Sequence, residues 1–324
     1  MKIVSLFSGA GGLDLGLLKA GHEIVWANDT FLDAATTYRA NIGDHIDTRN
    51  ICAVPSSEIP ACDVVVGGFP CQGFSVANWG RSSEDPRNQL FREMVRVVRD
   101  KEPRYFVAEN VRGLLSMGKG KALYEIEGAF SRATELGYRV RHQLVNAANY
   151  GVPQLRIRLI IVGVRADQPE LSVFPPSPTH AEPGCAHLFG LLPWESVGEA
   201  LAHFPEPEAG RHIPNHEHSH YKLTFNGHLG HRFIDPSRPA PTVTARGDDR
   251  GGVVVLHHPG NRRRMTAREL AAVQSFPDDF VFSGTKTSAY RQIANAVPPL
   301  LGKAIGAMLA EADRLASTGQ TEAA

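Results

Sequence analysis

The sequence predicts an α/β protein with a wound, mainly parallel sheet and a second, smaller and irregular domain. Apolar runs of strand length alternate with helical periodicity through the first half of the chain. This alternation is typical of a parallel sheet with helices on both faces. A glycine-rich turn, residues 8–12, joins the first apolar run to the first helical stretch. The pattern breaks near Pro169, and from Phe174 to about Pro241 prolines, glycines and histidines are frequent, which indicates a linker or an irregular domain.

The individual elements follow from these patterns. Strands are expected over residues 2–7, 23–27, 64–66, 105–108, 139–145 and 157–164. Helices are expected over residues 13–20, 32–40, 90–98, 124–136, 266–274 and 300–315. The helix at 266–274 carries the spacing of a capping box, Thr266 with Glu269. The tail after residue 315 is expected to fray.

Composition restricts the possible classes of protein. The 324 residues are 42% hydrophobic and 21% charged, and the formal net charge is zero. Any nucleic-acid binding must therefore come from local clusters of basic residues. The four cysteines form no CxxC pair, which favours free thiols in a reducing compartment. We expect no signal peptide and no membrane-spanning run, and hence a cytoplasmic protein.

Cys71 follows the expected strand at residues 64–66 and precedes a long polar segment. Reactive groups in open α/β sheets lie just past the carboxyl ends of strands. Pro70 fixes its own φ and restricts Phe69, so the backbone sets the direction of the cysteine. A buried structural cysteine is the alternative, and this tripeptide alone does not decide between the two.

Other residues at strand ends suggest a ligand site. Glycines in the first turn allow close approach of a ligand, and Asp29, after the second strand, is placed to bond a ribose. Together they favour an adenosine-containing cofactor without distinguishing NAD from S-adenosylmethionine. Glu109 could donate a proton near Cys71, or could be an ordinary ion-paired residue. Arg156 and Arg158 share one face and suit a phosphate or carbonyl oxygen, unless that strand is a solvated edge.

Taken in order, these segments resemble the C5-cytosine DNA methyltransferases, most closely the compact bacterial enzymes of restriction–modification type. The matching segments are Phe-x-Gly-x-Gly-Gly at 7–12, Pro-Cys-Gln at 70–72, Glu-Asn-Val at 109–111, Gln-x-Arg-x-Arg at 154–158, Arg-Pro-x-x-Thr-Val-Thr at 238–244 and Gln-x-x-Asn-x-Val at 292–297. The resemblance covers about residues 2–175 and 230–312. It implies a Rossmann-like catalytic domain of residues 1–178 plus 286–324 and, over residues 179–285, a target-recognition domain with its hinge.

The resemblance also implies catalytic roles. Cys71 would add as a thiolate to C6 of cytosine and make C5 nucleophilic. Glu109 would contact N3 and the exocyclic amine, and Arg158 would hold O2. Arg156 would orient Glu109 or nearby backbone. The methyl donor would be S-adenosyl-L-methionine, and no metal would be needed.

For the cofactor, Phe7 would pack on adenine, while Gly9, Gly11 and Leu13 would line the methionine portion. Asp29 stands where the family usually has Glu, and Thr30 replaces a large apolar residue, so Phe31 or Ile51 would stack on adenine. Asn50 replaces the usual Asp and could accept a bond from the adenine amine. Further cofactor contacts are expected from Ile51, Pro70, Leu90, Asn295 and Val297. Residues 291–298 are expected to open the last helix, with Asn295 and backbone amides ready for a carboxylate.

The DNA side follows from the need to extrude the target base. Residues 73–87 would close over the flipped cytosine, a plain surface loop being the alternative. Expected DNA contacts are Ser75, Arg81, Arg87, Thr244, Arg246 and Arg262, with Arg250, Arg263 and Arg264 as further candidates. His216, His218 and His220 alternate and are expected at the DNA surface rather than at zinc, because no cysteine accompanies them.

Three alternative functions fit the sequence less well. An RNA cytosine-5 methyltransferase would share the fold, but the Cys-Phe-Thr segment associated with that subgroup is missing from the sequence. Intact Cys71, Glu109 and Arg158 argue against an inactive DNA-binding homologue, and a nicotinamide dehydrogenase leaves Pro-Cys-Gln unexplained. The expected partner is double-stranded DNA, bound by a monomer associated with the nucleoid. A restriction endonuclease would be linked genetically and not physically, and no membrane partner is expected.

Overall fold

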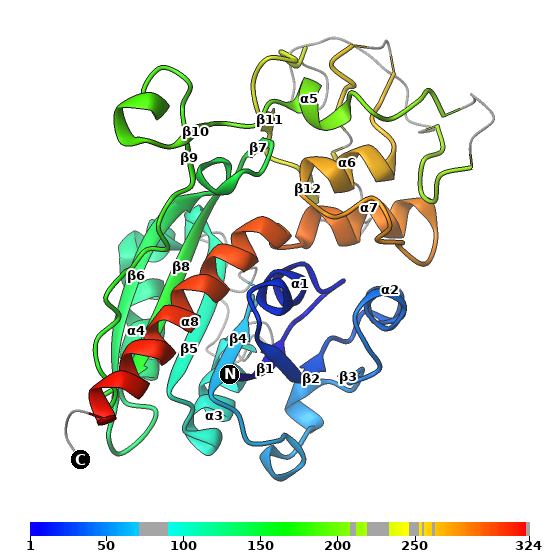
Figure 1. Cartoon of the computed structure of the whole chain (residues 1–324). Coiled ribbons are helices and arrows are strands. Elements are labelled where there is room, and N and C mark those ends of the chain that lie inside the picture. The colour runs from blue at the N-terminus through cyan, green and yellow to red at the C-terminus, as the bar shows by residue number, and fades with distance from the viewer. Residues whose placement is uncertain are drawn as a thin grey trace.

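A seven-stranded sheet organises the molecule (Figure 1). The computed structural model describes residues 1–70, 90–207, 212–218, 233–245, 253–254, 256–260 and 263–321. The strand order is β3-β2-β1-β4-β5-β8-β6, and β8 runs antiparallel to both neighbours while the other pairs are parallel. The strands are β1 Lys2–Leu6, β2 Glu23–Asn28, β3 Ile46–Asp47, β4 Val64–Gly67, β5 Tyr105–Val111, β6 Tyr138–Asn146 and β8 Ile157–Arg165. The expected wound, mainly parallel sheet is confirmed.

Helices cover both faces of this sheet. Successive strand residues point to opposite faces, and in β4 Val64 and Val66 enter one apolar core while Val65 enters the other. The first core contains side chains of α1 and α8, and the second contains side chains of α3 and α4. The helices are α1 Gly12–Lys19, α2 Leu32–Asn41, α3 Leu90–Lys101, α4 Lys121–Ser131 and α8 Pro299–Thr321. Burial on both faces explains why these strands are continuous apolar runs.

The carboxyl ends of four parallel strands meet at one edge of the sheet. Leu6 of β1 pairs with Asn28 of β2 and with Gly67 of β4, and Gly67 pairs with Ala108 of β5. The segments that follow these four residues therefore emerge side by side. They contain the glycine turn, Asp29, the Gly68–Pro70 segment and Glu109.

A second region lies above this edge and has its own apolar core (Figure 1). Its helices are α5 Val197–Leu201, α6 Ala267–Val273 and α7 Lys286–Asn295, and two-residue strands accompany them. These strands are β9 His180–Ala181, β10 Leu192–Pro193, β11 Ala240–Pro241, β12 Thr244–Ala245 and β13 Val253–Val254, and β11 pairs with β7 Gln154–Leu155. Single-turn 3₁₀ helices complete the fold: η1 Ile51–Ala53, η2 Ser56–Glu58, η6 Arg112–Leu115, η7 Met117–Gly120, η8 Ala147–Tyr150 and η9 Ala186–Phe189. The division into domains at residues 179 and 286 stays a prediction; α7 shares the third core with α6.

The structure corrects two expected helices. The helix expected at 124–136 is α4 Lys121–Ser131, which begins after Gly120 in the left-handed conformation. Residues 291–298 do not open the last helix, because residues up to Asn295 end α7 and α8 begins at Pro299. Pro298 disfavours a helical conformation at Val297, whereas a proline is tolerated at the first position of a helix. The capping box of α6 is confirmed, since Thr266 Oγ1 accepts a bond from Glu269 N and Glu269 accepts one from Thr266 N.

One helical stretch is long and apolar enough to cross a membrane by composition, which differs from the expectation that no run reaches that length. This stretch, Lys286–Ser317, contains α7 and most of α8. Of its most apolar window, 67% is buried inside the protein. The side chains of Leu301, Ile305 and Leu309 pack in the first core, so burial against the sheet explains the composition.

Candidate active site

The main polar cavity, about 840 Å³ in volume, lies where the carboxyl ends of the strands meet. It is lined by the turns after β1 and β2, the segment after β4, the end of β5, and the α7–α8 connection. Residues expected from the sequence that line it are Phe7, Gly9, Leu13, Asp29, Asn50, Ile51, Pro70, Leu90, Glu109, Arg156, Arg158, Thr244, Asn295 and Val297. Segments from distant parts of the chain thus bring the proposed catalytic and cofactor residues together around one space.

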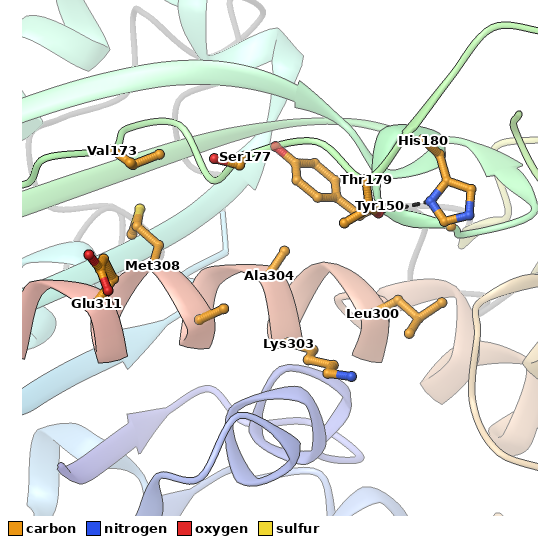
Figure 2. Close-up of a pocket in the computed structure, with 12 residues that line it drawn as sticks. Tyr150, Val173, Ser177, Thr179, His180, Leu300, Lys303, Ala304, Met308 and Glu311 are labelled. Atoms are coloured by element: carbon orange, nitrogen blue, oxygen red, sulfur yellow. Dashed lines mark hydrogen bonds between the residues drawn. The ribbon is translucent and has the colours of Figure 1, made fainter. Parts of the chain in front are cut away.

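A second cavity, about 620 Å³, lies between α8 and the segment around residues 173–180 (Figure 2). Its lining is mostly apolar, with Tyr150, Val173 and Met308 among the residues that contact it. His180 Nδ1 lies 2.8 Å from Thr179 Oγ1 at one end. The residues expected to act on substrate or cofactor line the other cavity, which we therefore treat as the candidate active site.

Glu109 and Arg158 form an ion pair on the cavity wall. Arg158 Nε donates to Glu109 Oε1 over 2.8 Å, and the two side chains are 11% and 12% exposed. A Cβ atom at Gly68 would lie 3.3 Å from Glu109 Oε2, so the glycine after β4 leaves room for this carboxylate. The pair therefore faces the cavity beside the segment that leads to Cys71.

The neighbouring backbone is fixed by Asn110. Its Nδ2 donates to Phe69 O over 3.0 Å, which anchors the chain directly before Pro70. Cys71 itself lies outside the described residues. The same is true of the expected DNA contacts Ser75, Arg81, Arg87, Arg246, Arg250 and Arg262.

Arg156 is only 2% exposed and bonds backbone carbonyls. Its Nη1 donates to Val243 O over 2.9 Å, and its Nη2 donates to Ala294 O and Ala296 O over 3.1 and 2.9 Å. Burial and the neighbouring charge of Arg158 lower the pKa of Arg156 to about 9, against the opposing effect of Glu109. Arg156 therefore joins the segment before β12 to the α7–α8 connection.

Gln154, to which the sequence assigned no role, performs a similar task. Its Oε1 accepts a bond from Val243 N over 2.9 Å, and its Nε2 donates to Gln274 Oε1 over 2.8 Å. Gln154 and Arg156 thus hold the framework of the site, whereas Arg158 two residues later contacts Glu109.

Asp29 organises the other end of the cavity. Its carboxylate accepts bonds from Gly9 N and Phe31 N over 2.7 and 2.8 Å. Burial raises its pKa, and these two bonds and the charge of Arg291 oppose the rise. A Cβ atom at Gly9, where φ is +56°, would meet nothing within 4 Å, so the turn leaves open space beside this carboxylate.

Apolar and stacking groups surround that space. Ile51 is 2% exposed and follows Asn50, whose Oδ1 accepts a bond from Cys52 N over 3.0 Å. The guanidinium of Arg291 lies 4.7 Å from the ring centroid of Phe31, a stacking arrangement that the sequence did not predict. A carboxylate beside a glycine turn, with apolar walls, fits an adenosine-containing cofactor.

Asp14 is a buried acid that sequence reasoning missed. Ser5 Oγ and Tyr38 OH donate to its two oxygens over 2.7 and 2.8 Å. Burial raises its pKa to about 6, although both hydrogen bonds favour the ionised form. The sequence does contain a signal for this contact: Ser5 interrupts an apolar strand, and Asp14 interrupts an apolar helix.

Three residues expected to contact DNA are structural instead. Arg263 pairs with Glu206 and Glu269 over 2.8 and 2.7 Å, and Arg264 is 6% exposed. His216 is buried, and its Nε2 donates to Pro205 O over 2.7 Å. Burial and internal partners leave these side chains unavailable to a DNA surface. Within the described ranges, no group of three or more His, Cys, Asp or Glu side chains could hold a metal ion.

Comparison with known proteins identifies the family of this chain. The family model of the C-5 cytosine-specific DNA methylases matches residues 1–311. The chain is 41% identical to the type II methyltransferase M.NgoFVII of Neisseria gonorrhoeae, over 92% of this chain and 83% of that protein. It is 40% identical to the type II methyltransferase M1.HphI of Haemophilus parahaemolyticus, over 94% of this chain and 85% of that protein.

Two solved structures share the fold. A putative DNA modification methyltransferase from an Escherichia coli prophage superposes with a TM-score of 0.75 at 24% identity, covering 97% of this chain and 99% of that one. The Dnmt2 methyltransferase of S. pombe superposes with a TM-score of 0.67 at 18% identity, with the same coverage. The family match over nearly the whole chain decides the identity: this chain belongs to the C-5 cytosine-specific DNA methylases and is a DNA (cytosine-5)-methyltransferase that uses S-adenosyl-L-methionine.

Proposed function

We propose that this chain is the modification enzyme of a type II restriction–modification system. It would methylate C5 of a flipped-out cytosine in a short duplex sequence through a covalent bond between Cys71 and C6. The observation that carries the proposal is the Glu109–Arg158 pair on the cavity wall next to Pro70. The type II methyltransferases among its relatives support the biological setting.

The chemistry assigns a task to each group. Attack of the Cys71 thiolate on C6 moves electron density toward N3 and O2 of the ring and makes C5 nucleophilic. Glu109 bonds N3 and the exocyclic amine, and Arg158 bonds O2, where negative charge develops. After C5 is methylated, its proton leaves and the bond between Cys71 and C6 breaks. Arg156 acts as a positioning residue, because its described bonds are to backbone carbonyls.

S-adenosyl-L-methionine, when bound, supplies a methyl group attached to an electrophilic sulfonium. We assign Asp29 to the ribose hydroxyls, Phe7 and Ile51 to the adenine faces, and Asn50 to the adenine amine. Gly9 and Leu13 line the methionine portion, together with Pro70, Leu90, Asn295 and Val297. Gly11, which was also expected there, packs against Ile42 and Tyr38 and is not among the residues that line the cavity. Asn295 ends α7, so it acts through its side-chain amide and not through a helix N-terminus.

The DNA contacts remain proposals. We keep Ser75, Arg81, Arg87, Thr244, Arg246 and Arg262 as the expected contacts with duplex DNA. The enzyme acts as a cytoplasmic monomer that reaches the nucleoid through DNA, and a partner endonuclease is linked to it by genetic context.

A mechanism-based trap tests the covalent step. With S-adenosyl-L-methionine present, duplex DNA with 5-fluorocytosine at the cognate position forms a stable adduct with the wild type, because after methyl transfer C5 carries fluorine in place of the proton whose removal would release Cys71. Cys71→Ser binds the same DNA without forming the adduct and does not methylate normal DNA. Bisulfite sequencing of DNA from cells that express the chain identifies the cognate sequence first. Normal turnover by Cys71→Ser, or no adduct at that sequence, contradicts the mechanism.

A further inference from the structure

The wall assigned to adenine is built on a weak local structure. Asn50 and Ile51 lie at the start of a segment that contains only the single turns η1 and η2. Isolated 3₁₀ turns have poor hydrogen-bond geometry and leave carbonyls without partners inside the turn. Around η1, Asn50 Oδ1 accepts from Cys52 N, Asn50 O accepts from Ala53 N, and Ile51 O accepts from Val54 N over 3.2 Å. Stabilisation of this wall must therefore come mainly from another part of the fold.

Arg96 of α3 supplies that support. Its Nη2 donates to Ile51 O and Val54 O over 3.0 and 3.1 Å. Its Nη1 donates to Ser56 Oγ over 2.5 Å, and its Nε donates to Glu93 Oε2 over 2.7 Å. One guanidinium thus bonds three points of the segment and is held in place by an acid on its own helix.

The hydrogen bonds of Arg96 are partly shielded from solvent, and acidic side chains of α3 orient both Arg96 and Ser56. The side chains of Arg96 and Glu93 are 22% and 19% exposed. Ser56 Oγ donates to Asp100 Oδ2 over 2.5 Å, which fixes the hydroxyl that Arg96 meets. Arg96 and Asp100, on successive turns of α3, therefore both form hydrogen bonds with the segment that carries Asn50 and Ile51.

The position of α3 connects the Arg96 contact to the active-site cavity. The helix begins at Leu90, which lines the active-site cavity, as do Asn50 and Ile51. Arg96 is not among the residues that line the cavity. Its effect on a ligand must therefore be exerted through the segment that it holds.

We propose that Arg96 is a positioning residue for the adenine end of the S-adenosyl-L-methionine site. By bonding the carbonyls of Ile51 and Val54, it holds Asn50 and Ile51 against the adenine ring. This inference rests on the assignment of those two residues to adenine under the proposed function. A lysine cannot replace the planar fork that serves several acceptors at once.

Calorimetric titration of the full-length enzyme with S-adenosylhomocysteine, without DNA, tests this role. Arg96→Gln raises the Kd by about 10-fold or more, because bonds from a charged donor are lost. Arg96→Lys gives an intermediate increase, and Ser56→Ala, which removes one point of contact, gives about a 2-fold increase. In steady-state assays, KM for S-adenosyl-L-methionine rises with the Kd, while kcat at saturating cofactor stays within about 2-fold.

Arg92→Gln is the matched control, because Arg92 lies on the same helix and its side chain is 62% exposed. Its Kd stays at the wild-type value. Adenosine alone serves as a second probe, and Arg96→Gln weakens its binding by the same factor as that of S-adenosylhomocysteine.

Asn50→Ala separates failure of this inference from failure of the site assignment. If Asn50→Ala and Asp29→Ala leave the Kd unchanged, the cavity assignment itself is wrong. If both weaken binding but Arg96→Gln, Arg96→Lys and Ser56→Ala do not, the role of Arg96 is overturned. A lowered Tm with an unchanged Kd likewise overturns it, since that result describes a purely structural residue. Should Arg96→Gln not fold, Arg96→Lys and Ser56→Ala decide the question.

Discussion

Two arginine–carboxylate pairs of nearly equal length have different uses in this molecule. Arg158 and Glu109 meet over 2.8 Å at the edge of the sheet, and both line the cavity. Arg263 and Glu269 meet over 2.7 Å in the second region, where Glu269 is 0% exposed and also accepts a bond from Thr266 N. The first pair presents charge to a ligand, and the second secures the start of a helix. An ion pair alone therefore does not identify an active site.

The surroundings of the two pairs explain the difference. At the sheet edge, four parallel strands end together, and Gly68 and Gly9 leave space where side chains would otherwise lie. In the second region, Leu270, Met265 and Tyr290 belong to a closed apolar core around α6. The Glu109–Arg158 pair can therefore exchange its mutual contact for contacts with a substrate, whereas the Glu269–Arg263 pair is enclosed by the protein.

The largest expected effect is on catalysis at the first pair. Glu109→Gln lowers kcat by about 10³-fold, because stabilisation of charge at N3 is lost. Its Tm stays close to that of the wild type, since the carboxylate faces a cavity. Single-turnover methylation and thermal unfolding measure the two effects. If Glu109→Gln keeps the wild-type kcat, or if its Tm falls strongly, the two ion pairs do not differ in the way proposed.

The matching change at the second pair affects stability. Glu269→Gln lowers the free energy of unfolding by about 3 kcal/mol, because Arg263 loses its buried partner and the cap of α6 is weakened. At a temperature where the variant is folded, its kcat remains near the wild-type value. Urea unfolding measures the change, and a loss below about 0.5 kcal/mol would contradict the structural role.

Asp14 makes stability depend on pH in the direction opposite to that of a paired carboxylate. Its pKa is about 6 in the folded chain, whereas an ordinary aspartate has a pKa of 3.8. The folded state therefore holds the proton more tightly, and this contribution is fully present below pH 3.8 and is lost as the pH rises through 6. Relative to Asp14→Asn, the wild type loses up to about 3 kcal/mol between pH 4 and pH 7.5.

Urea unfolding of both proteins at the two pH values measures this difference. The comparison with Asp14→Asn cancels the other carboxylates, which are present in both proteins. The same stability gap at both pH values would show that Asp14 has an ordinary pKa.

The smallest expected effect concerns the cap of α6. Thr266→Ala removes the hydroxyl that accepts the bond from Glu269 N and lowers stability by about 1 kcal/mol. Thr266→Ser retains the hydroxyl and serves as the control. If Thr266→Ala and Thr266→Ser are equally stable, the hydroxyl cap of α6 does not contribute to the stability of the second region.

Much of the fold could be predicted because its signals are local. Six strands, the glycine turn and the capping box follow from apolar runs and from the spacing of a few residues. The break between α7 and α8 was missed because only residues 296–298 separate two helical patterns. Arg263 pairs with acids instead of being free to contact DNA, which its basic neighbours do not reveal because its partner Glu206 lies more than fifty residues away.

The sequence by itself determined the chemistry, since Pro-Cys-Gln, Glu-Asn-Val and Gln-x-Arg-x-Arg specify which groups are present and in what order. Only the tertiary structure decided which groups face the ligand. Arg156 and Arg158 are the same residue type on the same side of one segment. Arg156 donates hydrogen bonds to backbone carbonyls that lie 87 to 140 positions away in the sequence, so its role is structural. Arg158 instead pairs with Glu109 on the neighbouring strand. The physical reason is that partners distant in sequence set the burial and charge of a side chain.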